Sequence, residues 1–312
     1  MTSSPLVATT REELGEILSA HRRAGESVAL VPTMGALHHG HAALFRAARQ
    51  HTGAGAVVAS LFVNPLQFAP GEDLDRYPRT FDDDLALAGK EGVDVVFAPS
   101  VDEVYPGGEP LVGVEPGWLG EVLEGKSRPG HFRGVLTVVA KLFGLVRPDT
   151  AYFGEKDYQQ LVLVRQMSRD LCLGVDVVGV PTVREPDGMA LSSRNQYLDV
   201  EERVRATVLS RALRAGAERA SYGLPPARWA AMSVLDEVPE ADLELDYLAI
   251  RTPDLREVED EFPQAPTAAR ILVAGRVGST RLIDNLPITL GPVARGGSAA
   301  EQAPDLATES SR

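Results

Sequence analysis

The sequence has little of several features that whole classes of protein require. Its 312 residues include one cysteine, Cys172, which excludes a disulfide framework and is typical of a reducing compartment. No apolar run approaches the roughly 18 residues of a membrane helix, and the first residues lack the apolar core of a secretory signal. We therefore expect a cytoplasmic protein that does not contact a membrane.

Positive charge is also scarce. The chain has 44 acidic residues against 31 lysines and arginines, a formal net charge of −13, and no basic stripe. Such a chain repels phosphate backbones, so we expect no nucleic-acid partner. A small anionic substrate would need a local positive pocket within this acidic surface.

Most of the chain alternates apolar strand patterns with helical ones. This alternation predicts an α/β fold, a doubly wound parallel sheet of the Rossmann-like kind, with a ligand crevice at the carboxyl ends of its strands. The expected strands are 27–31, 56–63, 94–99, 150–154 and 175–181, and the expected helices between them are 82–91, 133–146 and 157–171.

The pattern changes after residue 186, where helices come first and strands follow. We expect helices at 200–222 and 226–238 and strands at 243–250, 270–277 and 280–284. This order predicts a smaller C-terminal α+β domain with an antiparallel sheet. The predicted division is 1–182 for the larger domain, 183–290 for the smaller one, and 291–312 for a disordered tail that is rich in small residues.

The segment from Pro32 to His41, PTMGALHHGH, joins the apolar stretch 27–31 to a helix-forming stretch. Backbone N–H groups at the start of a helix, together with the positive end of its dipole, favour a bound anion. Gly40 allows the backbone to approach a ligand closely, and His38 and His41 can donate to one set of phosphate oxygens. The pattern therefore favours a nucleotide-binding transferase.

Two other interpretations of these histidines stay open. His38, His39 and His41 could form a metal cluster, although zinc sites on helices more often use a spacing of four, and Cys172 is far away in the sequence. They could also be ordinary loop residues. Half of the chain's six histidines fall within four positions beside two glycines, which favours phosphate contact.

Three further segments bear polar groups suited to an anionic ligand. Gly154–Asp157 (GEKD) follows an expected strand and supplies a lysine, with Asp157 as a helix cap. Leu191–Asn195 (LSSRN) offers two hydroxyls and a guanidinium near the expected domain boundary. Gln67 and Gln160 supply neutral amides. By itself each segment is also typical of an ordinary surface turn or polar loop, and the same is true of Arg128–Phe132 (RPGHF).

Taken together, residues 27–286 resemble the pantoate–β-alanine ligase family. The resemblance rests on the ordered motifs PTMGALHHGH, LFVNPLQF, RPGHF, FGEKDYQQL and LSSRN. It implies that His41, His38, Lys156 and Arg194 are catalytic, with His41 as proton donor, and that Gln67 and Gln160 bind pantoate or β-alanine. The implied ATP-binding residues are Met34, Gly35, Ala36, Leu37, His38, His39, Gly40, His41, Gly154, Glu155, Lys156, Asp157, Val183, Leu191, Ser192, Ser193 and Arg194.

The implied reaction has two steps and needs ATP and Mg²⁺. Pantoate attacks the α-phosphorus to form pantoyl adenylate and pyrophosphate, and the β-alanine amine then displaces AMP. The resemblance also implies a homodimer. It implies a metal that binds through the triphosphate, with Asp82–Asp84 as additional carboxylates and no assigned protein ligand. His39 and Leu191 depart from the common family residues, an acid or amide and a methionine.

Two other functions stay open at this point. Another H-x-G-H adenylyl- or cytidylyltransferase would have the same fold and a phosphorylated acceptor. We would expect extra cations for the acceptor's phosphate, whereas Gln67 and Gln160 are neutral. A nucleotide-binding sensor could use the same fold without turnover. The joint presence of His41, Lys156 and Arg194 argues against the sensor.

Overall fold

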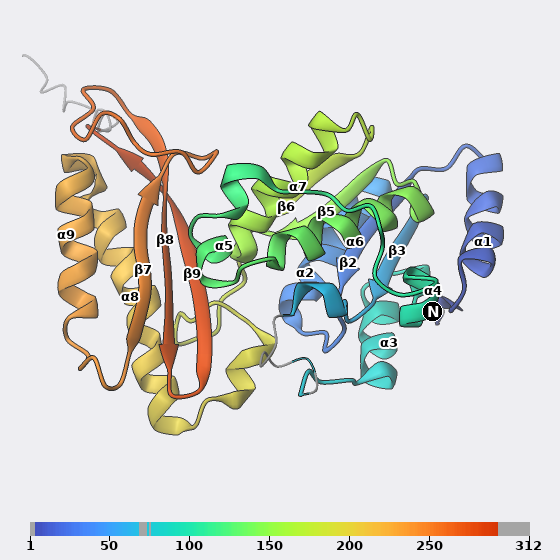
Figure 1. Cartoon of the computed structure of the whole chain (residues 1–312), viewed down its shortest axis with the longest axis horizontal. Coiled ribbons are helices and arrows are strands. Elements are labelled where there is room, and N and C mark those ends of the chain that lie inside the picture. The colour runs from blue at the N-terminus through green and yellow to red at the C-terminus, as the bar shows by residue number, and fades with distance from the viewer. Residues whose placement is uncertain (1–3, 69–73, 75, 293–312) are drawn as a thin grey trace, which may run out of the picture.

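Six parallel strands form the larger of two sheets in the computed structural model, which describes residues 4–68, 74 and 76–292 (Figure 1). The sheet order is β1-β4-β3-β2-β5-β6, and each neighbouring pair is parallel. The strands are β1 (Leu6–Ala8), β2 (Val28–Thr33), β3 (Ala56–Leu61), β4 (Val95–Phe97), β5 (Thr150–Gly154) and β6 (Asp176–Val180). The winding reverses between β2 and β5, so the sheet is doubly wound as predicted.

Side chains that alternate along each strand fill two separate cores. On β2, Val28 and Leu30 face one helical layer, whereas Ala29 and Val31 face the other. The first layer contains α1 (Arg11–Arg23), α6 (His131–Val146) and α7 (Tyr158–Asp170), and the second contains α2 (His39–Thr52) and α3 (Phe81–Lys90). Helices therefore cover and bury both faces of the sheet, which explains why its strands are continuously apolar.

The C-terminal part is a three-stranded antiparallel sheet covered by two helices. The sheet order is β7-β8-β9, with β7 at Glu244–Arg251, β8 at Thr267–Val277 and β9 at Thr280–Leu290. Helices α8 (Val200–Arg219) and α9 (Leu224–Leu235) pack against it. Figure 1 shows this sheet at one end of the molecule and α1 at the other. The remaining helices are α4 (Val101–Val104) and α5 (Glu124–Ser127), and 3-10 turns lie at Pro65–Gln67, Gly117–Gly120, Glu155–Asp157, Ser193–Tyr197 and Ala220–Tyr222.

The prediction that the last strand ends at Asp284 was wrong. β9 continues through Pro287 to Leu290, with Pro287 opposite Arg270 on β8. A proline cannot donate to a ladder, but β9 is an edge strand, so its missing N–H can face away from the sheet. Strand β1 was not predicted because its three residues have no pattern of their own.

The structure does not test two of the sequence predictions. The division at residues 182 and 183 stays a prediction. Residues 293–312 of the predicted tail lie outside the described residues. Among the helices in residues 4–68, 74 and 76–292, none is both long and apolar enough to cross a membrane.

A buried ion pair joins the two sheets' regions. The carboxylate of Glu124, on α5, accepts hydrogen bonds from Arg281 Nη1 (2.6 Å), Arg281 Nη2 (2.8 Å) and the Tyr247 hydroxyl (2.8 Å). Burial opposes ionisation of Glu124, but the hydrogen bonds and charge of Arg281 hold its pKa below the ordinary value. Glu124 is therefore an anion that is stabilised chiefly by Arg281 of β9, with smaller contributions from Tyr247 and Arg128.

We expect Arg281→Met to lower the free energy of unfolding by about 3–5 kcal/mol, because it leaves Glu124 buried without its cation. Denaturant titration measures this change. The double variant Glu124→Gln with Arg281→Met should be less destabilised than Arg281→Met alone. The matched control is Arg133→Met, since the ion pairs of Arg133 with Glu109 and Glu115 are exposed. Equal losses in Arg281→Met and Arg133→Met would contradict the assignment.

Candidate active site

A cavity of about 230 Å³ lies where the carboxyl ends of β2 and β5 face the segment after β6. It adjoins a second cavity of about 320 Å³ between the parallel sheet and β8–β9. Most of the sequence-predicted site residues line the first cavity: Met34, His38, Gly40, His41, Gln67, Gly154, Lys156, Asp157, Gln160, Val183, Leu191, Ser192, Ser193 and Arg194. Segments far apart in the sequence therefore meet at one place.

Five of the predicted ATP-binding residues do not line this cavity: Gly35, Ala36, Leu37, His39 and Glu155. The exposed side chain of His39 belongs to the first turn of α2 and lies outside the cavity. The other four shape the loops that bear the lining residues. Their predicted contact with nucleotide stays untested.

Asp84 holds the turn between β2 and α2. Its buried carboxylate accepts from the backbone N–H groups of Ala36 (3.0 Å) and Leu37 (2.7 Å). Both Gly35 and Ala36 have positive φ angles, 84° and 52°, so the chain reverses tightly here. These two amides are occupied by Asp84, so within this loop they do not point at the cavity as donors for an anion.

The structure gives Asp84 a different role from the metal binding suggested by the sequence. Its two oxygens accept from Ala36, Leu37 and the Thr80 hydroxyl, and the neighbouring Asp82 and Asp83 are exposed on α3. Among the described residues, no group of three His, Cys, Asp or Glu side chains could hold a metal ion.

The two histidines of the motif form a capping box with their rings. His38 Nδ1 accepts from the N–H of Gly40 (3.1 Å), and His41 Nδ1 accepts from the N–H of His38 (3.2 Å). Because each Nδ1 accepts, the ring proton of each neutral imidazole is on Nε2. The two ring centroids lie 4.1 Å apart at the start of α2.

Both histidines are neutral in this state. Burial lowers the pKa of His38 to about 4, and the positive charge of Lys156 adds to the effect. Burial lowers the pKa of His41 to about 3, with a further contribution from His38. In this state His41 is therefore a neutral hydrogen-bond donor and not a cation.

Positive charge at the cavity comes from lysine and arginine. Lys156 Nζ lies 3.6 Å from the carboxylate of Asp157. Desolvation opposes ionisation of Asp157, but Lys156 and Arg194 together keep its pKa below the ordinary value. Asp157 does not cap α7 with its side chain as predicted, because its carboxylate lies beside Lys156 instead.

Gln67 and Gln160 both line the cavity. Asn64 Nδ2 donates to Gln67 Oε1 (3.2 Å), and Asn64 is itself buried and bound by the Tyr105 hydroxyl (2.8 Å). The Gln67 amide is thus oriented with its NH₂ group toward Met34. Of the adjacent glutamines on α7, Gln160 lines the cavity, whereas Gln159 binds the backbone of residues 119–124.

Arg128 and His131 also line both cavities, although the sequence analysis did not select them. His131 Nδ1 lies 2.8 Å from the carbonyl of Gln67, and Arg128 Nη1 lies 3.0 Å from His131 Nε2. The ring therefore donates from Nδ1 and accepts at Nε2. The RPGHF motif was a signal for this pair, but a turn with these residues is also common on surfaces.

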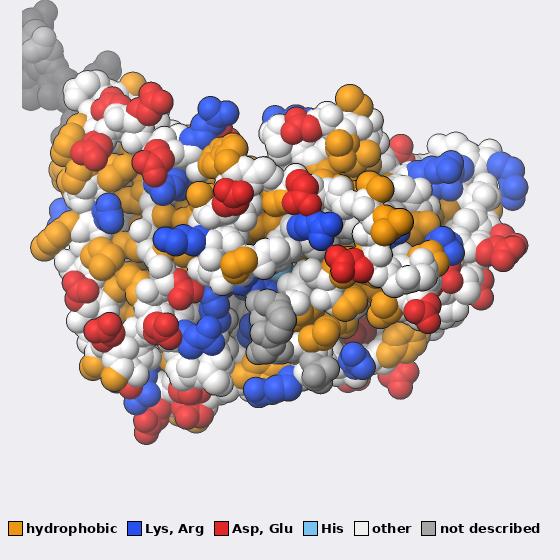
Figure 2. All heavy atoms as spheres, viewed as in Figure 1, with side chains coloured by type: hydrophobic (Ala, Val, Ile, Leu, Met, Phe, Trp, Pro, Cys, Tyr) orange, Lys and Arg blue, Asp and Glu red, His pale blue; other side chains and the backbone are white. Residues whose placement is uncertain are grey.

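Figure 2 shows Lys and Arg side chains gathered at the junction of the two sheets' regions, whereas charges of both signs are interspersed elsewhere on this face. Arg76, Arg128, Lys156 and Arg194 line the larger cavity. A chain with a net charge of −13 thus has a local positive cleft where an anion can bind.

Comparison with known proteins agrees with this geometry. The family model described as Pantoate-beta-alanine ligase matches residues 6–287. The chain belongs to the pantoate–β-alanine ligase family. It is 61% identical over 304 residues to a pantothenate synthetase of Nocardioides sp. strain JS614, with coverage of 96% of this chain and 90% of the relative. It is 57% identical to the pantothenate synthetase of Mycolicibacterium smegmatis, covering 89% and 86% of the two chains.

Solved structures show the same fold. The pantothenate synthetase of Thermus thermophilus is 52% identical, with a TM-score of 0.81 and coverage of 90% of this chain and 98% of that one. The pantoate–β-alanine ligase of Francisella tularensis, complexed with β-γ ATP and β-alanine, is 33% identical, with a TM-score of 0.72 and coverage of 90% and 97%. The predicted family, α/β fold and ligase activity are confirmed.

The lowered pKa values predict how stability depends on pH. The unfolded chain, with an ordinary histidine pKa of 6.5, takes up protons before the native chain does. The stability that these two groups contribute is therefore present above pH 6.5 and is lost as the pH falls through about 4 for His38 and about 3 for His41. We expect His38→Asn, which keeps a capping side chain, to reduce the acid slope of unfolding free energy by up to about 1.4 kcal/mol per pH unit.

Denaturant titrations at several pH values between about 7 and about 4 measure this slope. His39→Asn is the matched control, because His39 is the exposed neighbour in the same turn. An unchanged slope in His38→Asn, or an equal change in His39→Asn, would show that His38 is not the buried neutral group.

Proposed function

We propose that this chain condenses pantoate with β-alanine at the cavity between β2 and β5, in two steps, with MgATP as substrate. A carboxylate is a poor acylating agent because oxide is a poor leaving group. The pantoate carboxylate oxygen attacks the α-phosphorus, and the bond from the α-phosphorus to the bridging oxygen breaks, which gives pantoyl adenylate and releases pyrophosphate. The β-alanine amine then attacks the acyl carbon, forms the amide and releases AMP.

The observation that best supports this proposal is the meeting of three kinds of group around one cavity. The neutral Nε2–H donors of His38 and His41 lie at the start of α2, where the helix dipole also favours an anion. Lys156 and Arg194 supply cations from two other segments, and Gln67 supplies an oriented neutral amide. This set suits a nucleotide phosphate beside a small hydroxy acid.

The roles follow from these properties. We assign the nucleotide phosphates to the histidine pair, Lys156, Arg194 and the Ser192–Ser193 hydroxyls. We assign pantoate to Gln67 and Gln160. Neither step needs a protein nucleophile, so catalysis consists of positioning and stabilisation of charge that develops on the phosphate. His41, neutral in the free protein, donates a hydrogen bond there, and an anion that binds beside it raises the His41 pKa and favours the protonated ring.

The magnesium ion enters with the nucleotide in this proposal. Asp157 is the carboxylate that lines the cavity beside Lys156, and Asp84 is occupied by backbone amides. The homodimer and the cytoplasmic location stay proposals that rest on the family resemblance, and sedimentation measurements test the former.

Isotope exchange tests the first step. If activation of the carboxylate is a separate half-reaction, labelled pyrophosphate should enter ATP when pantoate and Mg²⁺ are present and β-alanine is absent. Addition of β-alanine should then release AMP. Exchange that persists without pantoate, or product formation with release of ADP, would overturn the proposal. A nucleotidyltransferase with another acceptor would show no exchange that depends on pantoate, and a sensor would show none.

Substitution of the glutamines tests the assignment of pantoate. We expect Gln67→Ala and Gln160→Ala each to weaken pantoate binding by about 1.5–3 kcal/mol, because each removes a hydrogen bond to a charged carboxylate, and to leave ATP binding unchanged. Separate titrations of pantoate and ATP measure both affinities. The control is Gln166→Ala on the exposed side of α7, which should change neither. Equal losses for the two ligands would indicate a disturbed pocket.

A further inference from the structure

We propose that Asn285, on β9, is a positioning residue that sets the place of Lys156 at the cavity. This inference rests on the proposed function, in which Lys156 contacts the nucleotide phosphates. Asn285 itself is buried, with 3% of its surface exposed, and it belongs to the antiparallel sheet, whereas Lys156 belongs to the turn after β5.

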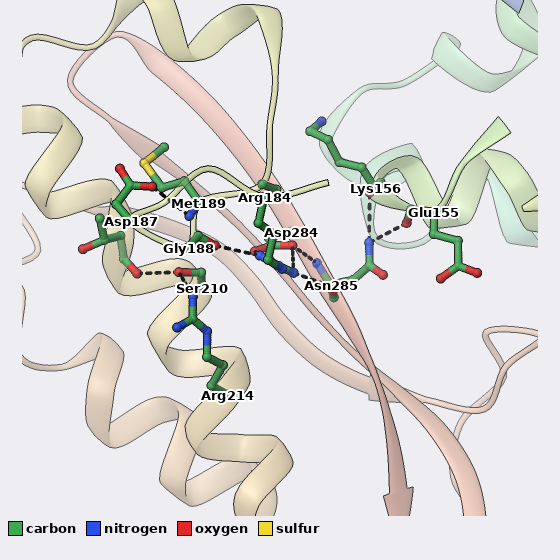
Figure 3. Close-up of polar contacts among 12 residues, drawn as sticks. Glu155, Lys156, Arg184, Asp187, Gly188, Met189, Ser210, Arg214, Asp284 and Asn285 are labelled. Atoms are coloured by element: carbon green, nitrogen blue, oxygen red, sulfur yellow. Dashed lines mark hydrogen bonds and ion pairs between the residues drawn. The ribbon is translucent and has the colours of Figure 1, made fainter. Parts of the chain in front are cut away.

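The Asn285 amide is bound at each of its polar atoms. Its Nδ2 donates to the carbonyl oxygens of Glu155 and Lys156, both at 2.9 Å. Its Oδ1 accepts from Arg270 Nη1. The NH₂ group faces two acceptors and the oxygen faces a donor, so the orientation of the amide is determined. Figure 3 shows this amide directed at the backbone of the turn, while the Lys156 side chain extends away from it.

The turn that bears Lys156 needs such support. Residues 155–157 form a single 3-10 turn, which is too short to satisfy its own carbonyl groups. Arg270 adds a second restraint, because its Nη2 lies 3.0 Å from Glu155 Oε2 and its guanidinium lies 3.6 Å from the ring centre of Tyr158. Glu155 thus anchors the turn to β8 and does not line the cavity.

Asp284, next to Asn285 on β9, restrains the Leu191–Arg194 segment, which supplies the second cation. Asp284 accepts two hydrogen bonds from Arg184, at 2.7 and 2.9 Å, and Arg184 also donates to the carbonyl of Gly188 (3.0 Å). Arg184 forms an antiparallel bridge with Ala190, directly before the Leu191–Arg194 segment. Figure 3 shows Asp284 facing Arg184 and the Asn285 amide facing the Lys156 turn, so two consecutive residues of β9 restrain the segments that present Lys156 and Arg194.

A displacement of about 1 Å at a reacting group can lower a rate about 100-fold, so the backbone position of Lys156 matters as well as its charge. We expect Asn285→Ala to slow adenylate formation about 10- to 100-fold, and Lys156→Ala to slow it on the order of 10²–10³-fold. If Asn285 acts through Lys156, adding Asn285→Ala to Lys156→Ala should change the rate by no more than about twofold.

The test is a double-mutant cycle on the full chain, with single-turnover rates of pantoyl adenylate formation at saturating MgATP and pantoate. Ile288→Ala, a buried change on the same strand away from the 230 Å³ cavity, is the control for a general loss of stability. It should lower the melting temperature while its effect on the rate is small and the same with Lys156 or Ala at position 156. Asn285→Ser, which can donate to one of the two carbonyls, should fall between wild type and Asn285→Ala, and it replaces Asn285→Ala in the cycle if the latter does not fold.

The outcomes separate this inference from the proposed function. Wild-type rates in Lys156→Ala would overturn the role of Lys156 and this inference with it. A slow Lys156→Ala combined with a wild-type rate in Asn285→Ala would overturn this inference alone. So would an Asn285→Ala effect of the same size in both backgrounds, because a residue with a general structural role has an additive effect.

Discussion

The pairing of β2 with β5 is the constraint on which the rest of the molecule depends. These strands are far apart in the sequence, and the crossovers leave them in opposite directions, so their carboxyl ends open a crevice that no crossing connection closes. The H-x-G-H loop follows one strand and the Lys156 turn follows the other. Alternating apolar side chains bury both faces of the sheet and hold these two strand ends at a constant separation.

The charge at this crevice is organised by burial as much as by residue type. Two histidines that use Nδ1 to cap α2 are held neutral by desolvation, so they present N–H donors rather than cations. Cationic groups come from Lys156 and Arg194 on other segments. Separating neutral donors from fixed cations lets an acidic chain bind an anion without a large positive surface.

The antiparallel sheet contributes more than a cover for the crevice. Through Glu124 and Arg281 it is joined to the parallel-sheet region by an ion pair that would be costly to break. Through Asn285 it binds the backbone of the turn that carries Lys156, and through Asp284 it binds the side chain of Arg184 near the Leu191–Arg194 segment. Because Arg281, Asp284 and Asn285 all belong to β9, movement of β9 relative to β5 would alter both the contacts between the two sheets and the crevice.

The sequence by itself determined the elements that depend on local pattern: the buried strands, the amphipathic helices and the motifs that identify the family. It did not reveal the roles of Asp84, Arg128 or Asn285, because an aspartate, an arginine and an asparagine in such segments also occur on surfaces. It placed the end of β9 too early, because whether a proline is tolerated depends on the strand being at an edge. Those roles are decided by partners distant in the chain, and tertiary structure alone sets the distances and burial that turn a common polar residue into a structural contact.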